Sequence, residues 1–567
     1  MADVLRGLPG IDLVSQGGQG KTSSVLLRGG DTRFTLVLVN GVEVNDPSNP
    51  ERTFDFAHFS TTDIERIEVL FGPQSTLYGS DAIGGVIHII TKKGMGAPRL
   101  EAEMETGSFE TFREHAGFRG RSGKTAYYLA VNHLQTEGIS AASAADGNTE
   151  RDGYTNLTFT GNLSLTVGAG SSLQLDLRSV DASNELDHYG GPGGDDPNFN
   201  SDASQLLVSG KLVFFPADIW EATLAVSRNS HDRHDLNEPD GVRPFTMELD
   251  FQGKSEKVEL LNNLYLGDRS TVTLGMDSER ETGSSTFFSD EFGPYTSTLP
   301  RESARINGVF VQEQYTTGSG AAMTLGARHD DHSDFGRATT WRAGLSVPLF
   351  GHTRLRSVYG TGFRAPSIDQ LFNPDYGNPD LSAERSRGWD AGLETLLGKD
   401  VRGSLSWHQT EYDDLIAWFD ADGDPSTWSD GSYANIATAR TKGVDLSLDA
   451  RVGKVSMGVS GSWLRTEDDE GEELLRRPQT RWGAKAGYYP SEGITFQADA
   501  TYTGEREDWG DVTLASYTLV NLSGSWRLDD SFTVLGRVQN LTDEEYEEAG
   551  GYGTPGRALY VGIRADM

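Results

Sequence analysis

The sequence of 567 residues contains no cysteine. This absence excludes a disulfide framework and thiolate chemistry, and it fits an oxidising compartment. The sequence also lacks any run of the ~18–20 apolar residues that a membrane-spanning helix requires. Strands could still cross a membrane, because only alternate residues of such strands need to be apolar. A hydrophobic content of 36% and a mean hydropathy of −0.46 fit that alternative.

Basic residues are scarce. The chain has 49 lysines and arginines against 84 aspartates and glutamates, and its formal net charge is −35. Binding of nucleic acid needs clustered basic side chains, so this balance argues against nucleic acid as a partner. It favours cations as partners, and the alternative is that the acidity only solvates loops and keeps the protein soluble.

Motifs of common catalytic and nucleotide-binding sites are missing as well. Gly20-Lys21-Thr22 is not preceded by the first glycine of a phosphate-binding loop. The GYGTPG segment at 551–556 leads into a terminal strand rather than a helix. No paired-histidine zinc motif, nucleophile elbow or Ser/His/acid set stands out. The sequence therefore predicts a protein that is not an enzyme.

The chain does contain a long succession of alternating segments, from about residue 96 to residue 567. Apolar and polar side chains alternate along 444–450, 494–502 and 519–526, and the chain is rich in glycine, with 68 residues. A soluble β-propeller would alternate too, but it buries both faces of its sheets, whereas these segments keep one polar face. The pattern therefore favours a transmembrane barrel with a polar lumen.

Residues 1–95 lack this regular alternation, and their pattern predicts a small domain of mixed helices and strands. The apolar segment 34–39 reads as a strand, and Asn40-Gly41 after it is a strong hairpin signal. The loop at 45–52 is polar and interrupted by proline, and we predict that it forms a ligand-facing apex. Its candidate ligand-binding residues are Asn45, Asp46, Asn49 and Arg52.

Three separated groups of motifs carry a family resemblance. The first is IERIEVLFGP at 64–73 with LYGSDAIGGVIHIIT at 77–91. The second is YGTGFRAPS at 359–367 with GNPDLSAE at 377–384, and the third is VQNLTD at 538–543. In order and spacing these motifs resemble those of TonB-dependent outer-membrane receptors. The resemblance covers both ends and the middle of the chain.

The resemblance implies an all-β membrane protein, a large antiparallel transmembrane β-barrel of about 22 strands with a small α+β plug domain in its lumen. The plug is expected at 1–95 and the barrel at 96–567. It also implies the Gram-negative outer membrane, with outer-membrane lipid as a partner. The implied activity is TonB-dependent transport of a scarce nutrient, with energy from the TonB–ExbB–ExbD system.

Both ends of the chain depart from the family pattern. A VLRGLPG motif, which follows the first plug strands in the family, stands at 4–10. The resemblance therefore implies an N-terminally truncated plug without a signal peptide or a TonB box, so that the chain as written would not recruit TonB. The family usually ends in an aromatic residue, whereas this chain ends in Met567, and we expect less efficient membrane insertion.

Acidic residues gather in two segments that are predicted as neighbouring loops. Oxygen ligands on flexible loops suit Ca²⁺, although two solvated loops of an acidic protein would look the same. NELDHY at 184–189 resembles a stretch of the cobalamin receptors in this family, whose neighbouring loops bind calcium, and this carries Asp187 over as a ligand. The other candidates come from local chemistry: Asp195, Asp196, Asp202, Asp232, Asp235 and Asp240.

The same stretch favours a corrinoid such as cobalamin as the substrate, with a ferric siderophore or haem as the alternative. A passive porin or adhesion barrel is a different class, and a plug that closes the channel argues against a porin. The acidic segment 420–425 begins like an EF-hand loop but lacks its glycine and glutamate. Trp418, Trp428 and Tyr433 fit a membrane-interface girdle or a stacking surface, and His234 is interpreted as a loop residue.

Overall fold

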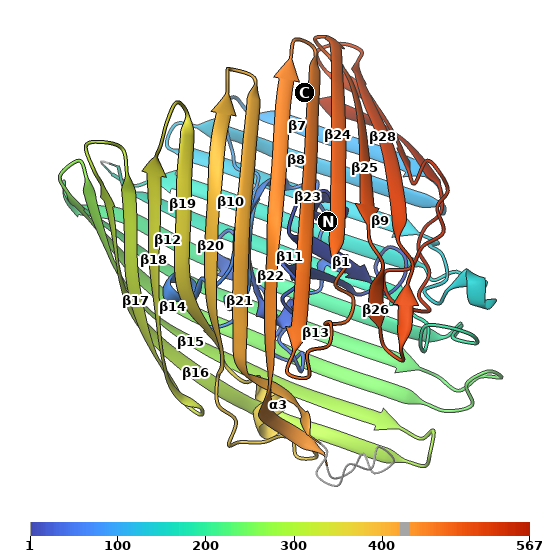
Figure 1. Cartoon of the computed structure of the whole chain (residues 1–567). Helices are drawn as coiled ribbons and strands as arrows, with labels where there is room; N and C mark the ends of the chain where they lie inside the picture. The colour runs from blue at the N-terminus through green and yellow to red at the C-terminus, as the bar shows by residue number, and fades with distance from the viewer. Residues whose placement is uncertain (1, 169, 420–430) are drawn as a thin grey trace.

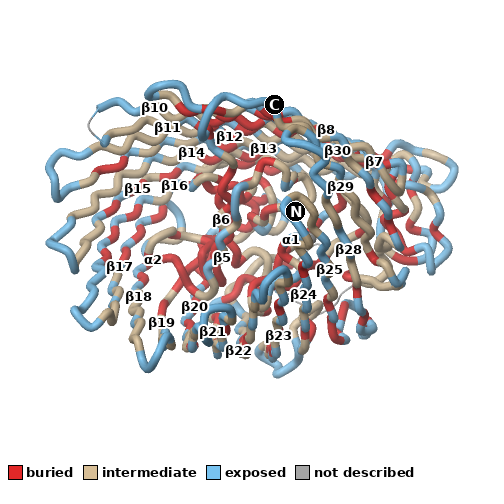
Figure 2. Tube along the Cα trace, turned by 90° about the horizontal axis from the view of Figure 1, so that it is seen from above, coloured by how far each residue is buried: buried red, intermediate tan, exposed pale blue. Residues whose placement is uncertain are grey.

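The computed structural model describes residues 2–168, 170–419 and 431–567. In this part of the chain 22 antiparallel strands close into one barrel, from β7 (Arg99–Gly107) to β30 (Ala558–Asp566), which pairs back onto β7 (Figure 1). A small luminal domain fills the barrel from inside, and Figure 2 shows its buried residues enclosed by the ring of strands. The predicted fold class is confirmed.

The luminal domain is built from short strands and helices. In chain order they are α1 (Ala2–Arg6), β1 (Ile11–Ser15), β2 (Ser23–Leu27), η1 (Thr32–Phe34), β3 (Thr35–Val39), β4 (Val42–Glu43), η2 (Phe56–His58), β5 (Ile64–Phe71), α2 (Ser75–Tyr78) and β6 (Gly85–Thr91). β1 pairs with β2, and the main sheet has the order β4-β3-β6-β5. The predicted hairpin joins β3 to β4, where Asn40 and Gly41 adopt φ angles of 52° and 90°.

The central strands of the main sheet of the luminal domain, β3 and β6, are buried on both faces. Every residue of β3 is buried, and in β6 only His88 is half-buried. Val37, Ile87 and Ile89 from these two strands belong to one apolar cluster, which also contains Leu207 of the barrel wall. Burial of this apolar surface stabilises the domain, because each fully buried aliphatic side chain contributes roughly 1.5–3 kcal/mol.

The barrel strands follow one another around the wall, so that neighbours in the sequence are neighbours in the sheet. After β7 they are β8 (Thr111–Ser122), β9 (Thr125–Thr136), β10 (Tyr154–Thr166), β11 (Ser172–Glu185), β12 (Phe199–Ala217), β13 (Trp220–Asn237), β14 (Met247–Leu266), β15 (Ser270–Ser289), β16 (Tyr295–Thr316), β17 (Ala322–His332), β18 (Gly336–Pro348), β19 (Thr353–Arg364), β20 (Glu384–Leu397), β21 (Val401–Phe419), β22 (Ser432–Val452), β23 (Val455–Asp468), β24 (Thr480–Ser491), β25 (Ile494–Thr503), β28 (Tyr517–Arg527), β29 (Phe532–Gln539) and β30. The connections contain η3 (Ala144–Asp146), α3 (Ile368–Phe372) and a hairpin of β26 (Arg506–Asp508) and β27 (Val512–Leu514).

The two ends of the barrel differ in the length of their connections. At the turn end, strands are joined by tight turns such as 218–219 between β12 and β13. At the loop end, the connections include 137–153 between β9 and β10, and 365–383, which contains α3 and lies at the bottom of Figure 1. Short turns at one end and longer loops at the other are typical of transmembrane barrels.

The wall alternates as the sequence predicts. On β13, Leu224 and Val226 face outward and are 40% and 48% exposed, whereas Asn229 faces the lumen and is 1% exposed. On β14, Val258 faces outward at 51% exposure and Ser255 is buried on the luminal side. An apolar outer face and a polar inner face suit a wall with lipid outside and a polar interior.

Residues 92–98 connect the luminal domain to the barrel, between the end of β6 and the start of β7. The boundary predicted at residue 95 falls in this connection and stays a prediction. At the other end of the chain, Met567 exchanges two backbone hydrogen bonds with Leu100, at 2.7 and 2.9 Å, beside the β30–β7 seam. No helix in the described residues is long and apolar enough to span a membrane.

Candidate functional site

The loop at 45–52 of the luminal domain is built around the side chain of Asn45, which is 3% exposed. Its oxygen accepts a hydrogen bond from Val37 N at 2.9 Å. Its amide donates to the carbonyl oxygens of Thr35 and Arg52 at 3.1 and 3.0 Å. Asn45 therefore ties the base of the loop to β3, and the structure does not leave it accessible to a ligand.

Asp46 and Asn49 shape the tip of the same loop and are half-buried. One carboxylate oxygen of Asp46 accepts hydrogen bonds from the backbone nitrogen and the hydroxyl of Ser48, at 2.9 and 2.7 Å. Asn49 accepts one from Glu51 N at 2.9 Å. Side chains that bond to the backbone two residues on are typical of turns. Contact of Asp46 and Asn49 with a ligand stays a prediction.

Arg52 is buried in ion pairs that join the luminal domain to the wall. Its Nη2 lies 3.0 Å from Asp81 Oδ2 and 3.6 Å from Glu43 Oε1, and it also pairs with Glu281 of β15. Burial raises the pKa of Glu43 well above its usual range, and the negative charge of Glu279 on β15 adds to this effect. Arg52 therefore neutralises buried carboxylates rather than facing the loop end, which corrects its predicted place.

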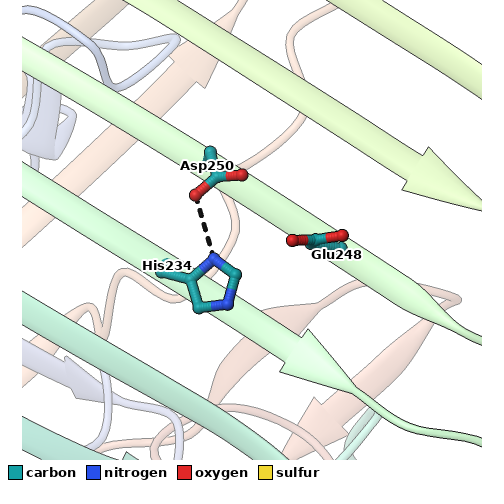
Figure 3. Close-up of side chains that lie close together, drawn as sticks. All are labelled: His234, Glu248 and Asp250. Carbon is teal, nitrogen blue, oxygen red and sulfur yellow. Dashed lines mark hydrogen bonds and ion pairs between the residues drawn. The ribbon is translucent and has the colours of Figure 1, made fainter.

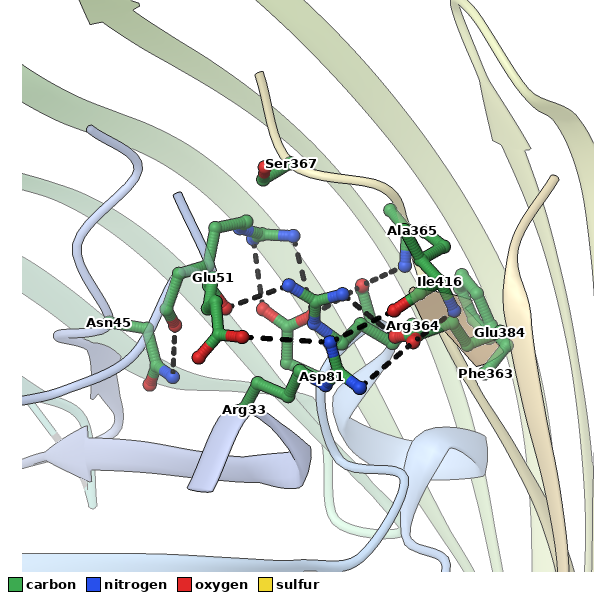
Figure 4. Close-up of polar contacts among 12 residues, drawn as sticks. Arg33, Asn45, Glu51, Asp81, Phe363, Arg364, Ala365, Ser367, Glu384 and Ile416 are labelled. Carbon is green, nitrogen blue, oxygen red and sulfur yellow. Dashed lines mark hydrogen bonds and ion pairs between the residues drawn. The ribbon is translucent and has the colours of Figure 1, made fainter. Parts of the chain in front are cut away.

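A second set of contacts surrounds Arg364, which is wholly buried at the end of β19 (Figure 4). Its guanidinium donates to Glu384 Oε2 and to the carbonyl oxygen of Glu51, both at 2.7 Å. Ser367 Oγ donates to the carbonyl oxygen of Pro50 at 2.6 Å. The second motif group of the sequence thus fastens the loop of the luminal domain to the wall. Loss of one partner from such a buried pair leaves an uncompensated charge.

At the loop end, carboxylates from the connections after β9 and β11 converge. Oxygen atoms of Glu150, Asp152 and Asp187 all lie within 4.8 Å of one another. Backbone nitrogens hold two of these side chains in place: Ala142 N donates to Asp187 at 2.5 Å, and Ala141 N donates to Asp152. We call Glu150, Asp152, Asp187, Asp195 and Asp196 the acidic cluster.

Asp196 is the most deeply buried side chain of the acidic cluster. Its backbone nitrogen donates to Asp187 Oδ1 and to Glu150 Oε1, both at 3.0 Å. Its side chain is fully buried, and neither carboxylate oxygen receives a hydrogen bond of ordinary geometry from the described residues. Positive charge comes from Arg243, whose Nε is 3.9 Å from Asp196 Oδ2. The Asp196 carboxylate thus has two long ion pairs, with Arg243 and His188, and the backbone of Asp196 joins it to Asp187 and Glu150.

Burial and mutual repulsion raise the pKa values of Glu150, Asp152 and Asp196. Burial raises the pKa of Glu150 to about 8, and its hydrogen bond with Asp187 contributes. Burial, followed by the charge of Asp187, raises the pKa of Asp152 to about 7. Burial also raises the pKa of Asp196 to about 6. A cation would relieve this repulsion, and the donors fit Ca²⁺, which takes about six to eight oxygen ligands.

A cavity of about 1020 Å³ separates the luminal domain from one side of the wall. Near the loop end its lining includes Ile139 and Pro555, and near the turn end it includes Thr495 and Ser525. His58 lines the cavity from the side of the luminal domain. The cavity therefore borders β22–β25, β28–β30 and β7–β10, and it extends along the luminal domain between the two ends of the barrel.

Comparison with known families decides the class of the protein. Residues 108–541 match the family described as TonB dependent receptor-like, beta-barrel, and residues 1–86 match the TonB-dependent Receptor Plug Domain. This chain belongs to the TonB-dependent receptor family. Such receptors are transport proteins of the Gram-negative outer membrane that work with TonB. The luminal domain is thus the plug, and the loop end is the extracellular end.

Relatives of this receptor share nearly its full length. Two are named Vitamin B12 transporter BtuB. The one from Vibrio vulnificus is 27% identical, over 99% of this chain and 87% of the relative. The one from Photobacterium profundum is 29% identical, over 99% of this chain and 89% of the relative. Two solved structures show the same fold. The siderophore receptor PirA from Acinetobacter baumannii has a TM-score of 0.81 at 19% identity, over 100% of this chain and 96% of that structure. The copper transporter OprC has a TM-score of 0.85 at 17% identity, over 100% of this chain and 95% of that structure.

Of the calcium ligands predicted for this receptor, the structure brings together Asp187, Asp195 and Asp196. Ser140 Oγ lies 3.2 Å from a carboxylate oxygen of Asp187 and 3.2 Å from one of Asp195. The charge of Asp240 acts on Asp196, but the Asp240 carboxylate accepts hydrogen bonds at 2.6 Å from two backbone nitrogens of its own turn. Asp240 is therefore a neighbour of the acidic cluster, and calcium binding itself stays a prediction.

The sequence predicts that Asp202, Asp232 and Asp235 lie in acidic loops. The structure instead places them on the wall strands β12 and β13. Asp202 and Asp232 are exposed on the outer face of the receptor. Asp235 is buried on the inner face, where its carboxylate accepts a hydrogen bond from Ser201 Oγ at 2.6 Å. The prediction fails here because these strands continue beyond the apolar part of the wall, where both faces are polar and the alternation disappears.

Sequence reasoning missed Glu150 and Asp152. Both precede β10, which pairs with β9 on one side and with β11 on the other. Because adjacent hairpins bring their connections together, the acidic pair meets the connection that carries Asp187. The available signal was this pair of acids before the alternating segment that starts at Tyr154, in the connection next to NELDHY.

A further group on the outer face contains His234, Glu248 and Asp250 (Figure 3). His234 Nδ1 lies 2.9 Å from Asp250 Oδ1 across the β13–β14 pair. His234 is thus a strand residue, which corrects its interpretation as a loop residue. All three side chains are partly exposed, and an ion pair at the surface accounts for their arrangement.

The acidic segment 420–425 and Trp428 lie outside the described residues. Trp418 and Tyr433, on either side of that segment, have ring centroids 5.7 Å apart, and the ring of Tyr376 is 5.9 Å from that of Trp418. These rings pack edge to face at the extracellular end. A membrane-interface girdle and a stacking surface for a ligand both stay predictions for them.

Proposed function

We propose that this TonB-dependent receptor imports a corrinoid such as cobalamin across the outer membrane. The observation that carries the proposal is the match of two proteins named Vitamin B12 transporter BtuB along 99% of the chain. The NELDHY stretch at 184–189, which contributes Asp187 to the acidic cluster, supports the same substrate. The structural relative named as a siderophore receptor supports the fold alone, at 19% identity.

The ligand binds first at the extracellular loops and at the tip of the plug, where Asp46 and Asn49 are half-buried. TonB, powered with ExbB and ExbD, then acts on the plug. We propose the cavity of about 1020 Å³ as the path, because it lies away from the buried ion pairs of Arg52 and Arg364. A shift of the plug on the cavity side would have to break the ion pair of Arg6 with Glu548, while the pairs of Arg52 and Arg364 hold the other side.

Calcium binding by the acidic cluster is part of this proposal. Carboxylates from two extracellular connections, at Glu150 and Asp152 and at Asp187, Asp195 and Asp196, would hold the ion. The ion would neutralise charges that otherwise repel and would thereby order both connections above the plug. Binding of the corrinoid should then depend on calcium.

The proposal is tested by equilibrium binding of cyanocobalamin to folded receptor in detergent, with Ca²⁺ and with chelator. We expect tight binding that weakens on chelation. Glu150→Gln with Asp187→Asn should remove the calcium dependence, whereas Asp146→Asn, at an exposed residue of the same connection, should leave it unchanged. A folded receptor that binds no corrinoid in either condition would overturn the substrate and leave the receptor family untouched.

A further inference from the structure

The outer face of β13–β16 carries basic side chains in register. Arg228 on β13 lies opposite Glu256 on β14, Glu256 lies opposite Arg280 on β15, and Arg280 lies opposite Arg305 on β16. Lys254 occupies the next outward position of β14 towards the extracellular end. Because neighbouring strands are about 4.8 Å apart, these residues extend over roughly 14 Å of the wall. We call Arg228, Lys254, Arg280 and Arg305 the basic row.

The basic row begins where the lipid-facing apolar surface ends. Immediately below Arg228 and Glu256, towards the turn end, the outward positions are Val226 and Val258, at 48% and 51% exposure. One further row down on β15 and β16 are Met276 and Val309, at 52% and 55%. Outward side chains recur at every second residue, so the basic row points to the same side as these apolar residues. Its charges therefore lie at the level of the lipid headgroups of the outer leaflet.

The basic row has few carboxylates beside it. Among the described residues, Glu256 is the one acidic side chain at its outward positions, and it pairs with Lys254 at 2.5 Å. Arg280 donates to Ser303 Oγ at 3.3 Å, and within the described chain none of the three arginines of the row forms an ion pair. A local excess of positive charge stands out in a protein whose net charge is −35.

The other side of the barrel shows that position above the apolar surface does not by itself create such an excess. On β20–β23 the corresponding outward positions alternate in charge along Arg387, Glu411, Arg440 and Glu467. Glu411 forms ion pairs with Arg387 at 2.7 Å and with Arg440 at 3.1 Å. The charges on this side neutralise one another, whereas the basic row has the one carboxylate of Glu256 for its four cations.

We infer that the basic row binds the phosphate groups of a phosphorylated glycolipid in the outer leaflet. Guanidinium groups form paired, charge-assisted hydrogen bonds with phosphate oxygens, and they do so more strongly near a low-dielectric surface. The adjoining apolar residues receive the acyl chains of the same lipid, so that one molecule satisfies both surfaces. This inference rests on the membrane location of the receptor and does not depend on its substrate.

The test is native mass spectrometry of the folded receptor in detergent, titrated with lipid A that carries two phosphates and with the same lipid after phosphatase treatment. The variant is Arg228→Gln, Arg280→Gln and Arg305→Gln combined. The matched control makes the same change at three exposed arginines that already have carboxylate partners: Arg337, Arg387 and Arg440. Resistance of each folded barrel to unfolding in cold detergent verifies that all three proteins are folded.

We expect the unmodified receptor and the control variant to bind the phosphorylated lipid alike, and the basic-row variant to bind it roughly a hundredfold more weakly. Removal of the phosphates should weaken binding to the unmodified receptor by a comparable factor. Equal binding of both lipids, or equal losses in the two variants, would overturn the inference. Either result would mean that the lipid is held by apolar contact or by overall charge.

Discussion

The plug meets two sides of the barrel wall in different ways. Against β15, β19 and β20 it is fastened by buried charge, with Arg52 paired to Glu281 and Arg364 paired to Glu384 and bonded to the carbonyl oxygen of Glu51. Towards β25, β28 and β29 a cavity of about 1020 Å³ lies between plug and wall. The plug is also bonded to other parts of the wall, by Asp12 to Arg481 of β24 and by Asp63 to Tyr128 of β9, so the contrast is one between buried charge and a cavity at these particular strands.

The largest expected effect concerns the fastened side. Arg364→Met removes the cation 2.7 Å from the buried Glu384 and leaves only Arg33, 3.9 Å away, which should cost about 3 kcal/mol. Thr495→Ala on the cavity side should change stability by less than about 0.5 kcal/mol. Denaturant titration of each folded variant, monitored by proteolysis of the plug, measures the two losses of stability. Equal effects of the two substitutions would contradict the distinction between the two sides.

Substitutions in the apolar core of the plug should destabilise it independently of its contacts with either side of the wall. Ile87 is 0% exposed in the plug core, so Ile87→Ala should cost about 2–5 kcal/mol by leaving a cavity. Ile563 is 45% exposed on the outer face of β30 and supplies the control, because Ile563→Ala leaves no internal cavity. Protease digestion should cut the plug of Ile87→Ala while the barrel stays intact. Joint unfolding of plug and barrel would show that the plug has no separate core.

Two glycines of the wall test the fastened side most directly. A Cβ at Gly388 of β20 would lie 2.6 Å from Pro73 Cδ of the plug, whereas one at Gly536 of β29, which pairs with the outward-facing Val561, would point away from the lumen and meet nothing within 4 Å. Gly388→Ala should therefore destabilise by about 1–3 kcal/mol through overpacking, and Gly536→Ala by less than about 0.5 kcal/mol. Thermal unfolding of the two variants decides this. A cost at Gly536 as large as that at Gly388 would mean that contact with Pro73 does not cause the loss.

The smallest effect concerns the loops above the plug. The pKa of Glu150 is raised to about 8 and that of Asp152 to about 7, so calcium must displace protons below these values. Calcium affinity should therefore rise with pH, by roughly tenfold per unit for each proton displaced. Without calcium, the folded loops bind more protons than the unfolded chain from about pH 4 upward, so their stability should fall as the pH rises towards 8. Calcium titrations at two pH values measure this, and a pH-independent affinity would remove these carboxylates from the site.

Local patterns in the sequence predicted the parts of the fold that depend on neighbouring residues. Alternation predicted the wall, and Asn40-Gly41 predicted the hairpin of the plug. The strand positions of Asp202 and Asp235 were not predictable, because hydrogen bonds to neighbouring strands, rather than apolar periodicity, continue β12 and β13 beyond the membrane.

The site depended on contacts between distant segments and was predicted only in part. Asp187 was found through a resemblance, but its meeting with Glu150 is set by the pairing of β10 with both neighbours. The polar loop predicts a ligand-facing Arg52, whereas its partner Glu281 lies 229 residues away in the sequence. Register and plug orientation, which no local pattern encodes, decide both cases.

The central claim is that this receptor selects a corrinoid. The most direct measurement is equilibrium binding of cyanocobalamin, a ferric siderophore such as ferric enterobactin, and haem to the same folded receptor in the presence of Ca²⁺. We expect tight binding of cyanocobalamin alone, and we expect chelation of Ca²⁺ to abolish it. Tight binding of the siderophore or of haem, with none of cyanocobalamin, would contradict it.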